Sequence, residues 1–315
     1  MIKYIVKRLF WAVPVLLIAS ILIFSIVHLI PGNPVYLLLP PDNTPEQVEA
    51  MMKLYDFDKP IYVQYMKWLG NILQGNLGQA ITTGQSVAKL IQMKIGPTFQ
   101  LAISAFILSF LIALPLGIHA GMKPDGFLSR RGLTIFTSFG LAMPSFWLGI
   151  LLILLFGVAL GWLPTTGYYS FSDNPLKALK FILLPAFTQA IPASVIYSNF
   201  ISSSVAAVRN SEYVIAARAK GIPKRQIIVK HILKNAMIPV VTISAINFGR
   251  LMAGAVITEN IFSIPGLGRL LVESIGARDY TVVQIDLMLI VTIFIIANLV
   301  ADILNGWLDP RIRLK

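Results

Sequence analysis

The amino-acid sequence predicts an all-α, polytopic membrane protein with six transmembrane helices. Hydrophobic residues make up 56% of the 315-residue chain and charged residues only 13%, about half of the ~25% usual in soluble domains. The apolar residues are gathered into stretches long enough to cross a bilayer, and most Lys and Arg residues lie between alternate stretches. This composition argues against a cytosolic enzyme, a disordered protein and a nucleic-acid-binding domain, because too few polar residues remain to cover a soluble surface.

Six segments meet the length that a spanning helix requires, which is about 20 mainly apolar residues for a hydrocarbon core about 30 Å thick. They are 9–30, 95–122, 132–160, 181–208, 235–258 and 281–305. The last two also carry charges, Arg250 in one and Asp286 and Asp302 in the other. The first segment follows a basic start, as in a signal peptide, but it is too long and lacks a small-x-small cleavage site. We therefore expect it to stay in place as an anchor.

The distribution of Lys and Arg in the short loops predicts the orientation, since cytoplasmic loops carry the excess of these residues. If the N-terminus lies inside, the inner segments hold 16 Lys and Arg residues and the short outer loops hold 4. Both termini are therefore expected in the cytoplasm. The same loops account for the net charge of +12, and the absence of cysteine excludes disulfides and thiolate chemistry.

The chain divides into three regions on this topology. Residues 1–30 form the cytoplasmic N-terminus and first transmembrane helix, residues 31–96 an extracytoplasmic helical loop domain, and residues 97–315 a core of five transmembrane helices with a cytoplasmic loop at about 209–235. Within the loop domain, Thr44 and Gln47 form a capping box that begins a helix over 45–54. Pro60 begins a second helix, and Ser86 is expected to cap a short third one. Two interpretations stay open for this domain: a cap packed on the bundle, or a docking surface.

The loop 209–235 predicts a short helix followed by a second one that returns to the membrane. Ser211 can cap the first helix, with Glu212 in its first turn. Alanines at 216, 217 and 219 keep this helix narrow enough to enter a groove. Gly221 supplies a left-handed stop, and Pro223 enforces the break. An ordinary positive inner loop that happens to be helical is the alternative interpretation.

This loop resembles the EAA loop of permease subunits of bacterial ATP-binding-cassette (ABC) importers. The chain departs from that pattern where Ile215 replaces the expected acid and Glu212 comes three residues earlier. Its variant form is similar to the B-type permeases of the dipeptide, oligopeptide and nickel family, which includes glutathione permeases. Further matching motifs are Pro31-Gly32-Asn33-Pro34, Pro144-Ser145-Phe146-Trp147, Trp162-Leu163-Pro164-Thr165, Phe262-Ser263-Ile264-Pro265-Gly266-Leu267-Gly268 and Asp309-Pro310-Arg311-Ile312-Arg313.

The resemblance implies the transmembrane domain of a type I ABC importer in the cell membrane of a prokaryote. Such a subunit forms half of the pathway for an ATP-driven, binding-protein-dependent import of di- or oligopeptides or related small solutes, and it is not an enzyme. Its partners would be a homologous sister permease, two cytoplasmic ATPases and an extracytoplasmic solute-binding protein. No cofactor is expected on this chain, which lacks a phosphate loop; ATP and Mg would bind the ATPases. The residues expected to couple to them are Glu212, Tyr213, Ala216, Ala217, Arg218, Lys220 and Gly221.

Charges and small residues within the spans suggest further roles. Arg250 and Asp286 are expected within about 6 Å of each other in depth, so we hypothesise that they pair or share a hydrated cavity. They are possible translocation-path charges, and a purely structural ion pair is the alternative. Ser194, Ser198 and Ser202 recur at every fourth position, which favours close helix packing over a polar pore stripe. Gly117 and Gly121 share this spacing on the second span.

Two other classes of function are weighed against this interpretation. A secondary transporter would work without ATPases and show an internal repeat, which the sequence lacks. An intramembrane hydrolase would need a catalytic constellation, but Asp286 and Asp302 lie about 24 Å apart along one span. His28, His119 and His231 share no ligand spacing, so no metal site is expected. The substrate stays open among dipeptides, oligopeptides, glutathione, a nickel complex and haem.

Overall fold

The computed structural model describes residues 2–29, 39, 42–54, 56–123 and 127–308. Within these residues the regular secondary structure is helical, apart from one isolated bridge between Gln79 and Ser86; turns and loops join the helices. The elements in chain order are α1 (Ile2–Leu29), α3 (Pro45–Leu54), α4 (Ile61–Leu73), α5 (Val87–Met122), α6 (Phe127–Ala142), α7 (Ser145–Leu152), the π-helix η1 (Ile153–Ala159), α8 (Pro175–Arg209), α9 (Glu212–Ala219), α10 (Lys224–Gln226), the π-helix η2 (Ile227–Leu233), α11 (Lys234–Phe262), α12 (Leu267–Gly276) and α13 (Tyr280–Leu308). The motifs at 31–34 and 309–313 lie outside the described residues.

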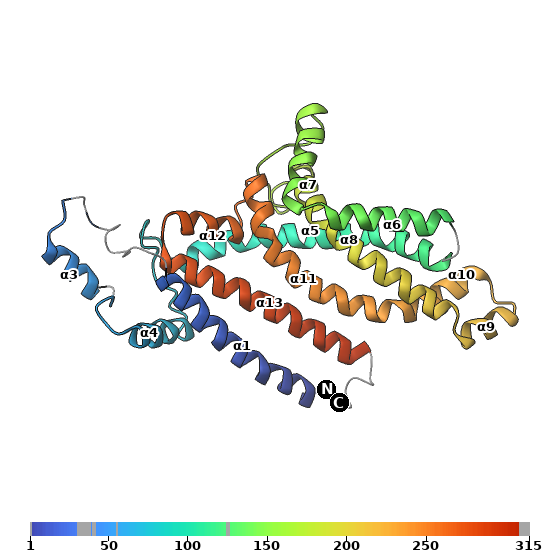
Figure 1. Cartoon of the computed structure of the whole chain (residues 1–315), viewed down its shortest axis with the longest axis horizontal. Helices are drawn as coiled ribbons and strands as arrows, with labels where there is room; N and C mark the ends of the chain where they lie inside the picture. The colour runs from blue at the N-terminus through green and yellow to red at the C-terminus, as the bar shows by residue number, and fades with distance from the viewer. Residues whose placement is uncertain (1, 30–38, 40–41, 55, 124–126, 309–315) are drawn as a thin grey trace.

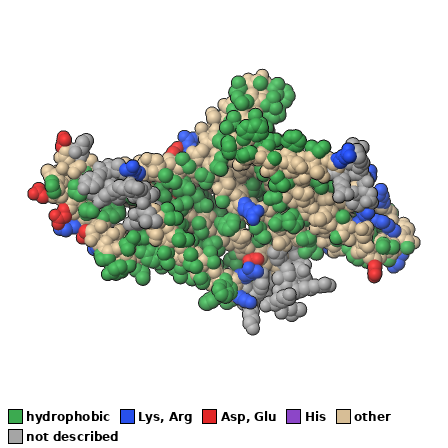
Figure 2. Space-filling model, viewed as in Figure 1, with side chains coloured by type: hydrophobic (Ala, Val, Ile, Leu, Met, Phe, Trp, Pro, Cys, Tyr) green, Lys and Arg blue, Asp and Glu red, His purple; other side chains and the backbone are tan. Residues whose placement is uncertain are grey.

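The long helices α1, α5, α8, α11 and α13 run alongside one another as a bundle (Figure 1). Helices α9 and α10 lie at one end of it, here called the α9 end, and α3, α4 and α12 lie at the other, the α12 end. Five helices in the described part of the chain are long and apolar enough to span a membrane, or six if the bent pair α6 and α7–η1 counts as one span. Figure 2 shows a wide hydrophobic surface between the two ends, with Lys and Arg gathered at the α9 end. This distribution is what a bundle immersed in lipid requires.

The third predicted span is broken rather than straight. Helix α6 and the segment α7–η1 meet at an angle of 101°, and α7–η1 projects from the bundle in Figure 1. Pro144 stands at the break as the residue before α7. A proline there has no N–H to donate to the preceding turn, and its ring disfavours helical geometry in the residue before it. The predicted span 132–160 is therefore built from two helical pieces, because Pro144 interrupts the segment.

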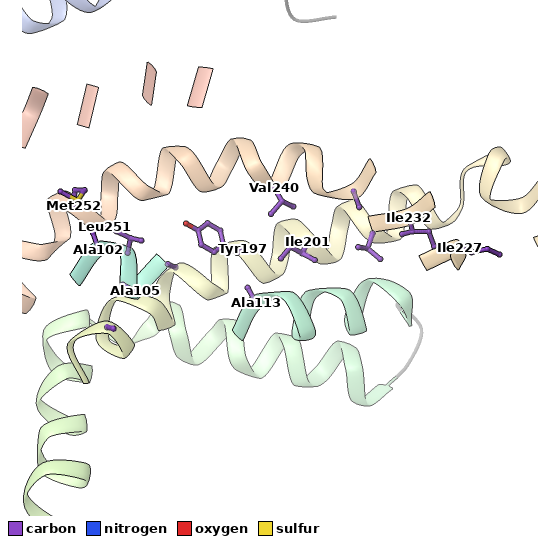
Figure 3. Packing of buried hydrophobic residues seen from close by; sticks show 14 of the residues in the cluster. Ala102, Ala105, Ala113, Tyr197, Ile201, Ile227, Ile232, Val240, Leu251 and Met252 are labelled. Atoms are coloured by element: carbon purple, nitrogen blue, oxygen red, sulfur yellow. The ribbon is translucent and has the colours of Figure 1, made fainter. Parts of the chain in front are cut away.

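The bundle core forms where α5, α8 and α11 meet (Figure 3). It is rich in alanine, and its largest buried side chain is Tyr197, whose ring stacks on Phe110 with centroids 4.8 Å apart. Helices α5 and α8 approach closely because Gly117 and Gly121 face α8. A Cβ atom at Gly121 would lie 2.6 Å from the backbone oxygen of Ser202. The predicted close packing of this pair of spans is confirmed.

The first two helices of the loop domain begin where the sequence predicts them, but the predicted third helix is not a separate element. The Thr44 N–H donates to Gln47 Oε1 at 3.0 Å and the Gln47 N–H donates to Thr44 Oγ1, which completes the capping box of α3. Pro60 precedes α4 as expected. Ser86, however, precedes no separate short helix: α5 continues without interruption from Val87 to Met122. Its 36 residues extend about 54 Å, well beyond a 30 Å hydrocarbon core, so the predicted third helix is the protruding start of the second span.

Candidate functional site

The most distinctive local structure at the α9 end is α9 itself. Its second half is built from alanines, and it ends in a Schellman motif. The Gly221 N–H donates to the Arg218 carbonyl at 3.0 Å, and the Ile222 N–H donates to the Ala217 carbonyl at 3.3 Å. Gly221 itself adopts the left-handed conformation, with φ of 70°. The predicted glycine stop is thus confirmed, and the chain turns there into Pro223, which precedes α10.

One face of α9 is anchored in the bundle. Val214 and Ala217, three residues apart, are both buried in the core that also contains Val205 and Ile232. Ala217 therefore faces the bundle core rather than the surroundings, unlike the other members of the predicted coupling set.

Polar contacts tie α9 and the end of α8 to the spans. The Tyr213 hydroxyl accepts a hydrogen bond from Asn235 Nδ2 at 2.9 Å, which links α9 to the start of α11. Arg209 Nη1 donates to the Met122 carbonyl at the end of α5 at 2.5 Å. A cation at a helix C-terminus is favoured because the last carbonyls carry a partial negative charge. Helix α9 is thus bonded to the start of α11, and the end of α8 that leads into α9 is bonded to the end of α5.

The other face of α9 is exposed. It carries the remaining residues of the predicted coupling set, together with an apolar side chain, Ile215, which is 56% exposed. This short surface therefore carries one carboxylate, one aromatic ring, one large aliphatic side chain and two basic side chains. The exposed residues of this α9 face, together with the two residues that follow the helix, are Glu212, Tyr213, Ile215, Ala216, Arg218, Ala219, Lys220 and Gly221.

The structure does not bring Arg250 and Asp286 together. Arg250 is exposed, whereas Asp286 is fully buried and neither of its carboxylate oxygens has a hydrogen-bond partner. Glu259, and not Arg250, is the ionisable neighbour of Asp286. The hypothesised direct ion pair is therefore absent from this structure, whereas the place of the two charges on the translocation path stays a prediction. Equal depth along two helices does not determine which faces meet.

Sequence reasoning missed a buried carboxylate at the α12 end. The side chain of Glu259, at the end of α11, is fully buried and accepts hydrogen bonds from Thr98 Oγ1 at 2.6 Å and from the Arg269 N–H at 3.0 Å. Thr98 Oγ1 in turn accepts from the Leu267 N–H at 2.8 Å. Together these groups satisfy the first N–H groups of α12 and join it to α5 and α11. A Cβ at Gly266 would collide with the Glu259 carboxylate.

A signal for this cluster was present in the sequence. An acidic residue at the end of an apolar span, followed by Gly266 and Gly268, indicates a buried charge beneath a loop that passes close to a helix. Gly268 packs so closely on α11 that a Cβ there would collide with the Val256 backbone. Among the described residues, no three His, Cys, Asp or Glu side chains gather as metal ligands would.

A bundle of apolar helices with a short amphipathic helix held at one end is the architecture of a membrane transport subunit. Residues 113–314 match the family described as the binding-protein-dependent transport system inner membrane component. Residues 1–102 match the N-terminal region described for the membrane component of such systems. The protein belongs to this family and is the permease subunit of an ABC importer, a multi-pass inner membrane transport protein rather than an enzyme.

Curated relatives match over the full length. The chain is 36% identical over 315 residues, covering 100% of both chains, to the glutathione transport system permease protein GsiC of Escherichia coli (strain K12) and to GsiC of Salmonella typhimurium (strain LT2). These matches place the chain in the dipeptide, oligopeptide and glutathione group of permeases. Subunits of this kind work with ATPase and solute-binding partners.

Solved structures show the same fold. Two inward facing structures of the MetNI methionine ABC transporter match with TM-scores of 0.57 and 0.54 at 18% identity. They cover 70% of this chain and 97% and 96% of the matched chains. The predicted type I importer transmembrane fold is thereby confirmed.

Proposed function

We propose that this chain forms half of the translocation pathway for glutathione or other small peptides, paired with a homologous sister permease. The full-length identity to glutathione permeases carries this proposal. The Lys and Arg distribution supports an orientation with both termini and α9 in the cytoplasm. The substrate would then be delivered by a solute-binding protein at the α12 end, and ATP would bind the two ATPases.

The coupling step is assigned to α9. Its exposed face offers the mixed apolar and charged side chains that a protein groove requires, while Val214 and Ala217 anchor its other face in the bundle core. If an ATPase binds the exposed face of α9, a movement of that ATPase would be transmitted through α9 to α8 and α11, on which its other face packs. Coupling of this kind needs a rigid element that both sites bias.

Gly221 tests this assignment. A Cβ at Gly221 meets no atom within 4 Å, but φ is 70°, so a bulky residue is opposed by the backbone conformation and not by space. Left-handed geometry costs L-residues about 1–2 kcal/mol, and asparagine tolerates it better than a β-branched residue. We expect Gly221→Val to reduce ATP-driven uptake by about fivefold or more, and Gly221→Asn to retain most of it.

The measurement is uptake of labelled glutathione and ATP hydrolysis, in proteoliposomes that contain the assembled transporter and its binding protein. Equal uptake by Gly221→Val and the unaltered protein, at equal amounts in the membrane, would contradict the coupling role of α9. Liposomes with the permeases alone serve as the control. Substrate movement in them would favour the secondary-transporter alternative.

A further inference from the structure

Three aspartic acids lie on or directly before α13, and two of them have evident partners. The Asp302 carboxylate is partly exposed and forms an ion pair with Arg8 at 2.8 Å. Asp279 is buried, but its Oδ2 accepts hydrogen bonds from the Thr82 N–H at 3.0 Å and from the Thr82 hydroxyl at 2.9 Å. A cation or a set of donors stabilises the ionised form of each of these two acids. The third, Asp286, has a different environment.

Asp286 is buried without any such partner. Its exposed fraction is 0%, and neither of its carboxyl oxygens has a hydrogen-bond partner in the part of the chain that the structure describes. Removing an ionised carboxylate from water without a donor or a cation costs far more free energy than removing a neutral acid. Side chains of this subunit alone produce the burial, so the argument depends neither on the level of the bilayer nor on a second subunit.

A neighbouring acid makes the ionised form of Asp286 still less favourable. Glu259 of α11 is the charged group that acts on Asp286, and two like charges in one buried region repel each other. Donors distinguish the two acids, because Glu259 accepts from the Thr98 hydroxyl at 2.6 Å and from the Arg269 N–H at 3.0 Å. Lys94 of α5 also acts on Glu259. The negative charge therefore belongs on Glu259, and a proton bound by this pair of acids belongs on Asp286.

The charged side chains of the other helices that pack against α13 do not alter this assignment. Arg269 and Glu273 of α12 pair with each other at 2.7 Å at the surface. Arg8 of α1 pairs with the other acid of α13, and Arg250 of α11 is exposed. Among the described residues, none of these cations is within hydrogen-bond reach of Asp286.

We propose that Asp286 is a proton-binding site, a carboxylic acid that stays protonated at neutral pH where α13 packs near Glu259 of α11. The ligand is a proton rather than a metal ion, because no third acidic or histidine side chain joins the two acids in the described part of the chain. The bound proton lets α13 pack beside a buried negative charge without adding a second one. This inference concerns the subunit itself and holds whichever solute the transporter carries.

Infrared spectroscopy tests this assignment, because the C=O stretch of a protonated carboxyl lies at higher frequency than the carboxylate and amide bands. Spectra are recorded at neutral pH on the assembled transporter in lipid nanodiscs. The samples are the unaltered protein, Asp286→Asn and the matched control Asp302→Asn, whose carboxylate is already paired with Arg8. In a further sample, this subunit alone contains aspartate labelled with carbon-13 at the side-chain carboxyl.

We expect an acid C=O band that is lost in Asp286→Asn, retained in Asp302→Asn and shifted to lower frequency by the label. Identical acid bands in the unaltered protein and in Asp286→Asn would overturn the proposal, since Asp286 would then be ionised. A band that the label does not shift would overturn it as well, because the proton would lie on a glutamate. If Asp286→Asn does not assemble, the labelled unaltered subunit still decides: absence of a shifted band contradicts the proposal.

Discussion

Single residues at the α12 end show how one buried carboxylate can organise a loop. Glu259 accepts hydrogen bonds from Thr98 and from the backbone of Arg269, and Gly266 leaves the space that its carboxylate occupies. The side chain thus acts as a distant cap for α12, where an acidic group is favoured by the helix dipole. A buried charge is retained only where donors replace the lost water.

Replacing this carboxylate with an amide should destabilise the α12 end. In Glu259→Gln the amide NH₂ group would face a donor, either the Arg269 N–H or the Thr98 hydroxyl, and leaving one buried group unsatisfied costs about 1–3 kcal/mol. We expect a lower thermal unfolding temperature, measured by tryptophan fluorescence of the purified transporter. Glu273→Gln is the matched control, because Glu273 is exposed and pairs only with Arg269. An unchanged melting temperature for Glu259→Gln would contradict the capping role.

At the scale of elements, α5 and α8 pack closely against each other, whereas α1 packs on the outside of the bundle, against α13. Small residues bring α5 onto α8 near the α9 end, while the hydroxyls of Ser194 and Ser198 bond back to their own helix at 2.7 and 3.0 Å. These hydroxyls are therefore satisfied without a pore, as expected for packing residues. Helix α1 is tied to α13 by the Arg8–Asp302 ion pair at 2.8 Å.

The close approach of α5 and α8 predicts a specific sensitivity to one methyl group. Gly121→Ala would place a Cβ 2.6 Å from the Ser202 carbonyl oxygen, and overpacking of this kind costs about 1–3 kcal/mol. Gly132→Ala on α6 meets nothing within 4 Å and should be neutral or slightly stabilising. The measurement is the monodisperse fraction in size-exclusion chromatography after heating. If both variants behave alike, the helices do not pack through Gly121.

At the scale of the whole molecule, two chemically different ends enclose an apolar middle. Lys and Arg gather at the α9 end in Figure 2, whereas the α12 end carries both signs of charge. In a membrane this asymmetry sets the orientation, because cationic loops are retained in the cytoplasm. The α9 face would then lie on the side of the proposed ATPase partners, and the α12 end on the opposite side of the membrane.

Labelling of single cysteines tests this orientation. Thr83→Cys in the loop domain and Lys220→Cys after α9 are both exposed positions. A membrane-impermeant maleimide added to spheroplasts should label position 83 and spare position 220 until the membrane is opened with detergent. Labelling of position 220 before lysis would contradict the proposed orientation and, with it, access of α9 to cytoplasmic ATPases.

The sequence alone was sufficient to predict the membrane spans and the ends of several helices. Apolar segments of the required length predicted the spans, the Thr44 and Gln47 pair predicted the start of α3, and Gly221 predicted the end of α9. Each of these depends on neighbours along the chain or on the thickness of the bilayer. The motifs around 209–235 also pointed to the permease family, which the full-length matches confirm.

Only the tertiary structure decided which faces meet. Asp286 lies near Glu259 and forms no hydrogen bond with Arg250, Ala217 faces inward, and the two helices on either side of Pro144 meet at 101°. Hydropathy and helix rise report depth and length, but they do not report rotation about a helix axis or the direction after a break. Those are determined by side-chain packing between segments far apart in the sequence. The sequence by itself therefore determined the membrane class and the short helix α9 with its glycine stop, whereas packing decided which side chains surround the buried carboxylates.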